Sequence, residues 1–269
     1  MIATFEGSFS MFIRNERSVK EFIRFYPFVS TLIIINLIIW LLYFLQLPIG
    51  FRIYDFGIGQ NFAVYHGQYW RLITPIFLHG GLSHVIFNSF SLVLFGPALE
   101  QMLGKFKFIL AYFITGIFAN FATYIINPTS MTLHLGASGA IYGLFGIYIF
   151  MVLFRKHLID PRNAQIVMTI FIIGIVMTFI QPNINIAAHI FGAIGGFAIA
   201  PIALHQAEPF SMVKNYMKVQ SKRNVESDDI RFNPNRWNKR RKINSKSFVN
   251  ILWGVLIILF LIGLFSRFF

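Results

Sequence analysis

Two residues, Ser138 and His189, are of the types that acyl transfer requires, and each stands near the start of a long apolar segment. A serine hydroxyl is a weak nucleophile, so it needs a base within hydrogen-bond reach and donors for the oxyanion that develops. A neutral imidazole can serve as that base, and burial in a low-dielectric site favours the neutral form. The two residues therefore predict a serine nucleophile, Ser138, with His189 as its general base.

A third apolar segment contains His84 and Asn88, which are four residues apart and therefore share one face of a helix. Together with the backbone amide of Ser138, they are candidate donors to an oxyanion. Glu100 is the only acidic residue inside the apolar segments, and it lies near the far end of its segment. These residues predict a Ser–His dyad rather than a triad.

Taken singly, each of the two central residues has a plainer interpretation. Ser138 could bond to a carbonyl of its own helix, and His189 could be a satisfied interior histidine. Their placement at the same depth as His84 and Asn88 favours a functional site, because ionisable residues inside a membrane are rare and usually functional.

The remaining histidines near these positions do not indicate a metal site. His79 precedes His84 by five residues, which is roughly 140° around a continuous helix, so the two do not form an obvious metal pair. His134 is expected to face water, with a place in the wall of the site as the alternative. The H-E-x-x-H pattern of zinc proteases does not occur. We expect neither a metal nor another cofactor.

The helices that would position these residues are indicated by composition. The chain has 269 residues, of which 56% are hydrophobic and only 12% charged, which is typical of a membrane protein. It contains no cysteine, so disulfides, thiolate metal sites and a cysteine nucleophile are excluded. A spanning helix needs about 20 apolar residues. Seven segments qualify, and they predict an all-α polytopic bundle: residues 28–47, 82–103, 107–127, 136–154, 164–181, 185–204 and 248–266.

The positive charges give the expected orientation. Of the 23 Lys and Arg residues, all but Arg52, Arg71 and Arg267 fall on one side of such a bundle, which predicts a cytoplasmic N-terminus. The net charge of +13 is therefore explained without nucleic acid. The basic run at residues 239–242 is expected to hold its loop against an anionic inner leaflet.

For the nucleophile to reach its base, two helices must approach closely, and small residues permit this approach. Gly139 and Gly143 are four residues apart in one segment, and Gly192 and Gly196 have the same spacing in the other. We expect these two glycine surfaces to face each other.

The motifs occur in the order Trp70-Arg71, His84-x-x-x-Asn88, Gly136-x-Ser138-Gly139 with Tyr142, and Ala188-His189-x-x-Gly192-x-x-x-Gly196. This order resembles the rhomboid family of intramembrane serine proteases over residues of about 30 to 204. The resemblance implies six core helices, the catalytic roles given above, Tyr142 packed beside His189, and a scaffold role for Trp70 and Arg71. It also implies single-pass membrane proteins as substrates.

The expected organisation has four parts. Residues 1–27 form a cytoplasmic segment in which Ser18 and Glu21, at capping-box spacing, begin a short interfacial helix. Residues 28–204 form the six-helix core. Residues 205–247 form the basic loop, and residues 248–269 an additional transmembrane helix outside that core. The loop at residues 48–81 is too apolar for a plain linker and is expected to rest partly in the outer leaflet, and residues 181–185 are a candidate cap.

Two other functions remain open from the sequence. One is a catalytically inactive rhomboid-like factor that binds membrane proteins, although such proteins typically lack the nucleophile or base. The other is a transporter, which would be expected to show broken helices near the midplane. A bacterial cell membrane is the expected location, because no organelle transit peptide is visible. The sequence indicates neither the substrate nor the oligomeric state.

Overall fold

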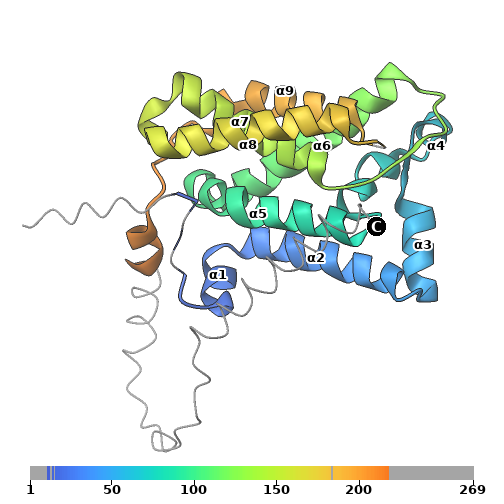
Figure 1. The fold of residues 1–269 in the computed structure, drawn as a ribbon, viewed down its shortest axis with the longest axis horizontal. Helices are drawn as coiled ribbons and strands as arrows, with labels where there is room; N and C mark the ends of the chain where they lie inside the picture. The colour runs from blue at the N-terminus through green and yellow to red at the C-terminus, as the bar shows by residue number, and fades with distance from the viewer. Residues whose placement is uncertain (1–10, 13, 15, 183, 218–269) are drawn as a thin grey trace, which may run out of the picture.

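The computed structural model describes residues 11, 12, 14, 16–182 and 184–217. This part of the chain is predominantly helical (Figure 1). The α-helices are α1 (Val19–Phe25), α2 (Pro27–Phe44), α3 (Pro48–Gly57), α4 (Asn61–Tyr65), α5 (Leu82–Leu103), α6 (Lys105–Ile126), α7 (Ser138–Phe154), α8 (Pro161–Ile180) and α9 (Ile186–Ala203). The shorter elements are the 3-10 helices Tyr69–Leu72, Thr74–Phe77 and Lys156–Leu158 and the antiparallel strands β1 (Gly59–Gln60) and β2 (Leu133–His134).

The predicted membrane bundle is confirmed for the described residues. Helices α2, α5, α6, α8 and α9 are long and apolar enough to cross a membrane, and α7 is an apolar helix of 17 residues. Each begins and ends within a few residues of the predicted span. The seventh span, predicted at residues 248–266, and most of the basic loop lie outside the described residues. The protein is an all-α, multi-pass integral membrane protein.

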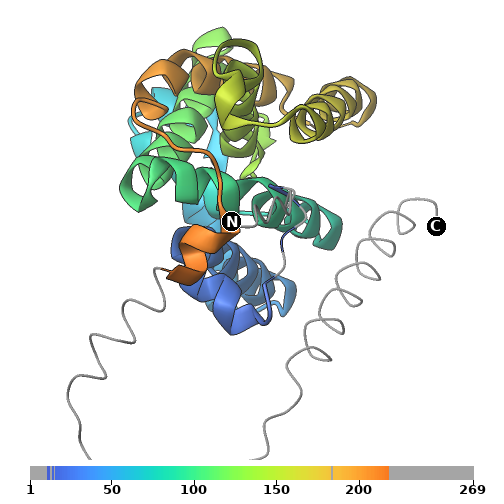
Figure 2. The same cartoon turned by 90° about the vertical axis from the view of Figure 1, so that its left-hand side faces the viewer.

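Helix α7 is the centre of the bundle. Most of its side chains are buried, and it packs against α9, α6 and α5. By contrast, α8 lies at the edge of the bundle, where it exposes most of its surface (Figure 2). The loop at residues 48–81 joins α2 to α5, it bonds through Pro75 to Gly136 before α7, and the start of α7 meets the start of α9. This end of the bundle is called the loop end below. Ser138 and His189 both belong to it.

The loop end is a folded layer of short helices and a strand. The expectation that this loop rests partly in the outer leaflet stays a prediction. The ring of Trp70 stacks on Phe56 at 5.1 Å between centroids, and its Nε1 donates to the Phe56 carbonyl. The Arg71 guanidinium donates to the carbonyls of Ile58 and Asp55. Trp70 and Arg71 therefore close the turn after α3, which fits a scaffold role.

The opposite end contains the one acidic residue of the six described apolar helices. The two carboxylate oxygens of Glu100 accept hydrogen bonds from the backbone N–H groups of Phe28 and Val29, at 3.1 and 2.9 Å. These groups lie in the first turn of α2, where N–H groups have no partner within their own helix. Glu100 therefore caps α2 and lies away from the loop end.

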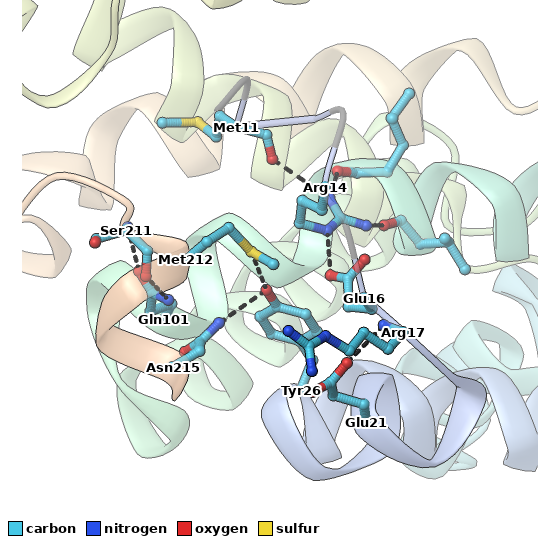
Figure 3. A network of polar contacts seen from close by, with 12 residues as sticks. Met11, Arg14, Glu16, Arg17, Glu21, Tyr26, Gln101, Ser211, Met212 and Asn215 are labelled. Atoms are coloured by element: carbon cyan, nitrogen blue, oxygen red, sulfur yellow. Dashed lines mark hydrogen bonds and ion pairs between the residues drawn. The ribbon is translucent and has the colours of Figure 1, made fainter. Parts of the chain in front are cut away.

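The N-terminal segment is attached to the bundle by Arg14. Pro97 inside α5 cannot donate to the Val93 carbonyl, which is left without its usual helical partner. The Arg14 guanidinium donates to this carbonyl and to that of Leu94, and it pairs with Glu16 (Figure 3). A buried arginine thus satisfies the carbonyl that a proline has freed.

The predicted capping box at α1 forms only in part. The Ser18 hydroxyl accepts from the Glu21 amide, as expected. The Glu21 carboxylate, however, accepts from the amide of Arg17 instead of Ser18. Directly after α1, the Tyr26 hydroxyl accepts from Asn215 at 2.9 Å and contacts the Met212 sulfur, which ties residues 212–215 to the start of α2 (Figure 3).

Replacing Glu100 should destabilise the bundle without touching the loop end. Glu100→Ala leaves two N–H groups in the first turn of α2 without acceptors, and that of Val29 is buried. We therefore expect a loss of about 1–3 kcal/mol in the free energy of unfolding. Glu100→Gln retains one acceptor and should lose less. Unfolding in detergent micelles would measure both. Glu208→Ala, which removes an exposed ion pair with Lys214, is the control and should change stability by less than about 0.5 kcal/mol. Equal stability of Glu100→Ala and the control would contradict the capping role.

Candidate active site

Ser138 is the first residue of α7, and the chain enters this helix through a glycine with a positive φ. Gly136 has φ of 129°, a conformation that residues with a Cβ rarely adopt. Its N–H donates to the Pro75 carbonyl at 2.9 Å, so the 3-10 helix Thr74–Phe77 fixes the approach to the nucleophile. The first backbone bond at this end of α7 runs from Ile141 to Ala137, so the amide of Ser138 precedes the helical ladder.

His189 lies in the first turns of α9, with 7% of its surface exposed. Its ring stacks on that of Tyr142 at 4.1 Å with an angle of 17° between the planes. Its Nδ1 lies 2.8 Å from the Thr178 hydroxyl oxygen. The imidazole is therefore held on one face by α7 and on one edge by α8.

The glycine surfaces of α7 and α9 face each other as expected. A Cβ at Gly192 would collide with the Gly139 carbonyl, and one at Gly196 would collide with the Gly143 carbonyl. The backbones of the two helices therefore touch at these points, with no side chain between them.

This packing brings the first turns of the two helices together, and a Cβ at Gly139 would lie 3.6 Å from the Ala188 carbonyl oxygen. The side chains of Ser138 and His189 share no hydrogen bond in the described structure. Hydrogen bonds between catalytic groups often form fully only when substrate is bound.

His84 and Asn88 lie on the α5 side of the same region. The position that a Gly136 Cβ would occupy is 2.6 Å from His84 Nε2 and 3.7 Å from the Ser138 hydroxyl oxygen. His84 and the nucleophile therefore both border Gly136. The buried Asn88 amide donates one hydrogen to the His84 carbonyl at 2.9 Å, which leaves it a second hydrogen to donate.

Comparison with known proteins identifies the family. The sequence model of the family described as "Rhomboid domain" matches residues 66–206, slightly more than half of the chain. The chain belongs to the rhomboid family. It is 44% identical to "Putative rhomboid protease YdcA" of Bacillus subtilis (strain 168) over 198 residues, which cover 74% of this chain and 98% of that protein.

Further relatives share a smaller part of their length with this rhomboid chain. "Rhomboid protease GluP" of the same Bacillus strain is 36% identical over 58% of this chain and 30% of its own length. "RHOMBOID-like protein 9, chloroplastic" of Arabidopsis thaliana is 30% identical over 55% of this chain and 35% of its own length.

Two further histidines, His79 and His134, lie near the rhomboid site and pack against the residues around it. His79 is fully buried, its ring meets that of His84 edge-on at 5.0 Å, and burial lowers its pKa. The expectation that His134 faces water holds only in part, because the residue is half-buried. It pairs with Gly59 in the two-stranded sheet and lies 3.3 Å from the Asn61 side chain, and burial lowers its pKa to about 4. Among the described residues there is no cluster of His, Asp and Glu that could hold a metal.

Thr178 is the residue of the site that the sequence did not reveal. It is one of three buried residues of α8, and its hydroxyl contacts both His189 and Tyr142. Its signal in the sequence is weak, since it is a small polar residue near the end of an apolar span, and such residues commonly bond to their own helix.

Substitution at the contact between α7 and α9 should disrupt the packing of the two helices. Gly192→Ala places a methyl group against a backbone carbonyl that cannot move independently, so we expect a loss of about 1–3 kcal/mol in stability. Gly195→Ala, on the same helix, meets a Phe118 ring edge that can turn, and it should cost less. Thermal unfolding in micelles would compare them. If Gly192→Ala matched the wild type, the close contact would be refuted.

Proposed function

We propose that this rhomboid-family chain is an intramembrane serine endopeptidase that hydrolyses peptide bonds in or near transmembrane segments. Ser138 is the nucleophile, His189 is the general base, and the reaction passes through an acyl-enzyme. The observation that carries the proposal is the position of Ser138 at the start of α7, where the next residue, Gly139, meets the part of α9 that holds the buried His189 ring. The protease names of the relatives support it.

The first half-reaction breaks the peptide bond. The Ser138 oxygen attacks the carbonyl carbon of the substrate while His189 takes the hydroxyl proton. The tetrahedral intermediate then collapses, its C–N bond breaks, and the amine leaves with the proton that His189 returns. The acyl group remains on Ser138 as an ester.

The second half-reaction consumes one water. His189 takes a proton from the water as the water oxygen attacks the ester carbonyl. The second intermediate then collapses, the bond between the carbonyl carbon and the Ser138 oxygen breaks, and His189 returns the proton to that oxygen, which releases a carboxylic acid. Every proton in the cycle moves through one imidazole, so no metal or other cofactor is required.

Three groups are proposed to stabilise the oxyanion. The Ser138 amide lies at the positive end of the α7 dipole. His84 borders Gly136 beside the nucleophile, and Asn88 has one amide hydrogen free. Each donor of this kind contributes on the order of 10²–10³ in rate. Tyr142, Gly136, Gly139, Gly192 and Gly196 are proposed to support the site through packing.

The proposed substrates are single-pass membrane proteins. A transmembrane helix hides its amides in its own hydrogen bonds, so cleavage should favour segments that unwind at low cost, such as those with helix-weakening residues. Because the site lies at the loop end, water and the cleavage point should both lie near that face.

The orientation of the protein is proposed from the charges. A cytoplasmic N-terminus places the site near the outer face of what we propose is a bacterial cell membrane. The basic loop that follows the core then lies against the anionic inner leaflet.

Cleavage of a transmembrane substrate by the full chain in vesicles tests the proposal. Ser138→Ala and His189→Ala should each lower the rate by at least about 10³-fold, because nucleophile and base act as a unit. Ser30→Ala, a buried serine near the start of α2 at the end away from the loop end, is the matched control and should retain activity. A serine-directed fluorophosphonate should label the wild type but not Ser138→Ala, and a chelator should not prevent labelling.

Each alternative predicts a different result. Undiminished cleavage by Ser138→Ala or His189→Ala would refute the mechanism. Binding of the substrate without cleavage by the wild type would favour an inactive binding factor. A solute flux that survives Ser138→Ala would favour a transporter.

A further inference from the structure

The Thr178 hydroxyl contacts three groups, one on its own helix α8, one on α9 and one on α7. Its oxygen lies 2.8 Å from the Gly174 carbonyl, 2.8 Å from His189 Nδ1 and 3.1 Å from the Tyr142 hydroxyl. Thr178 is almost fully buried, with 1% of its surface exposed. These contacts therefore form without competition from solvent.

The hydrogens in this network can be distributed in only one way that serves all three contacts. The Gly174 carbonyl has no hydrogen, so its contact requires the single hydrogen of the Thr178 hydroxyl. Thr178 must then accept in the other two contacts, with its two lone pairs. The hydrogens come from the Tyr142 hydroxyl and from Nδ1 of His189.

This distribution determines the tautomer of the neutral imidazole. A proton on Nδ1 leaves Nε2 as the nitrogen with a free lone pair, and only that nitrogen can take a proton. In a Ser–His–Asp triad, the acid provides the same service by accepting from Nδ1. In the described structure, Thr178 occupies the corresponding place with a neutral hydroxyl.

The surroundings of Thr178 preserve the arrangement. A Cβ at Gly174 would come within 2.8 Å of the Tyr142 hydroxyl, so the glycine leaves room for this group beside Thr178. Tyr142 in turn stacks on the His189 ring and limits its rotation. Helices α7, α8 and α9 each contribute one side chain to the network.

We propose that Thr178 is a positioning residue that fixes His189 in the Nδ1–H tautomer and stabilises the imidazolium that forms when the base takes a proton. The inference rests on the proposed function of His189 as the base. It adds a third member, outside the predicted dyad, that acts through His189 and does not touch the substrate.

Kinetics of the full chain in vesicles test the role. Thr178→Val keeps the shape of the side chain but removes the acceptor. We expect kcat to fall by about 10- to 100-fold, the usual value of a hydrogen bond to a charged group, while KM changes by less than about twofold. Thr178→Ser keeps the hydroxyl and should remain within about threefold of the wild type. Thr169→Val, an exposed threonine on the same helix, should behave as the wild type.

Nitrogen-15 NMR of histidine-labelled protein tests the tautomer independently of cleavage. The His189 signals can be assigned by their loss in His189→Gln. In the wild type, Nδ1 should be protonated and Nε2 bare, whereas Thr178→Val should show a mixture of both tautomers.

The results separate the inference from the proposed function. If Thr178→Val retained wild-type kcat and the wild-type tautomer, the positioning role would be overturned. Equal losses of activity and thermal stability in Thr178→Val and Thr178→Ser would show a packing role only. If the wild type cleaves nothing while the tautomer still depends on Thr178, the proposed function fails and the contact stands.

Discussion

The contact between the backbones of α7 and α9 is the constraint on which the rest of the structure depends. In lipid, helices gain little from burying apolar side chains, so they associate through close packing and hydrogen bonds. The Gly139 and Gly143 carbonyls lie where Cβ atoms of α9 would otherwise stand, and a Cβ at Gly146 would likewise meet the Ala193 carbonyl. The glycines therefore set how closely the first turns of the two helices approach.

The lack of water inside the membrane also explains where the polar side chains of the bundle lie. Each unpaired backbone group inside a membrane costs several kcal/mol. Glu100 satisfies the first turn of α2, and Arg14 satisfies the carbonyl that Pro97 frees. Charged residues at the end away from the site thus complete helix ends and interruptions, and the chemistry at the loop end is left to groups that can be neutral.

The sequence predicted the features that depend on composition and spacing. Runs of apolar residues located the six described membrane helices. Pairs of glycines four residues apart predicted the contact between α7 and α9. The role of Thr178 could not be predicted in this way. Helix α8 is apolar on all sides, so its sequence does not indicate which face meets the bundle. The half-buried position of His134 was missed for a related reason, because its partner Gly59 lies far away in the chain and the strand pairing leaves no periodic signal.

The group that accepts from Nδ1 of His189 is the Thr178 hydroxyl, and a hydroxyl suits this buried position better than a carboxylate would. An ionised acid beside His189 would have to lose its hydration in a buried, low-dielectric setting, and this penalty can exceed the attraction to the imidazolium. A threonine hydroxyl accepts the same hydrogen bond without that penalty, and its own hydrogen is satisfied by the Gly174 carbonyl of α8. The hydroxyl stabilises the imidazolium less strongly than a carboxylate would. The stacked ring of Tyr142 and the glycine contact with α7 must therefore supply the remaining restraint on the position of the base.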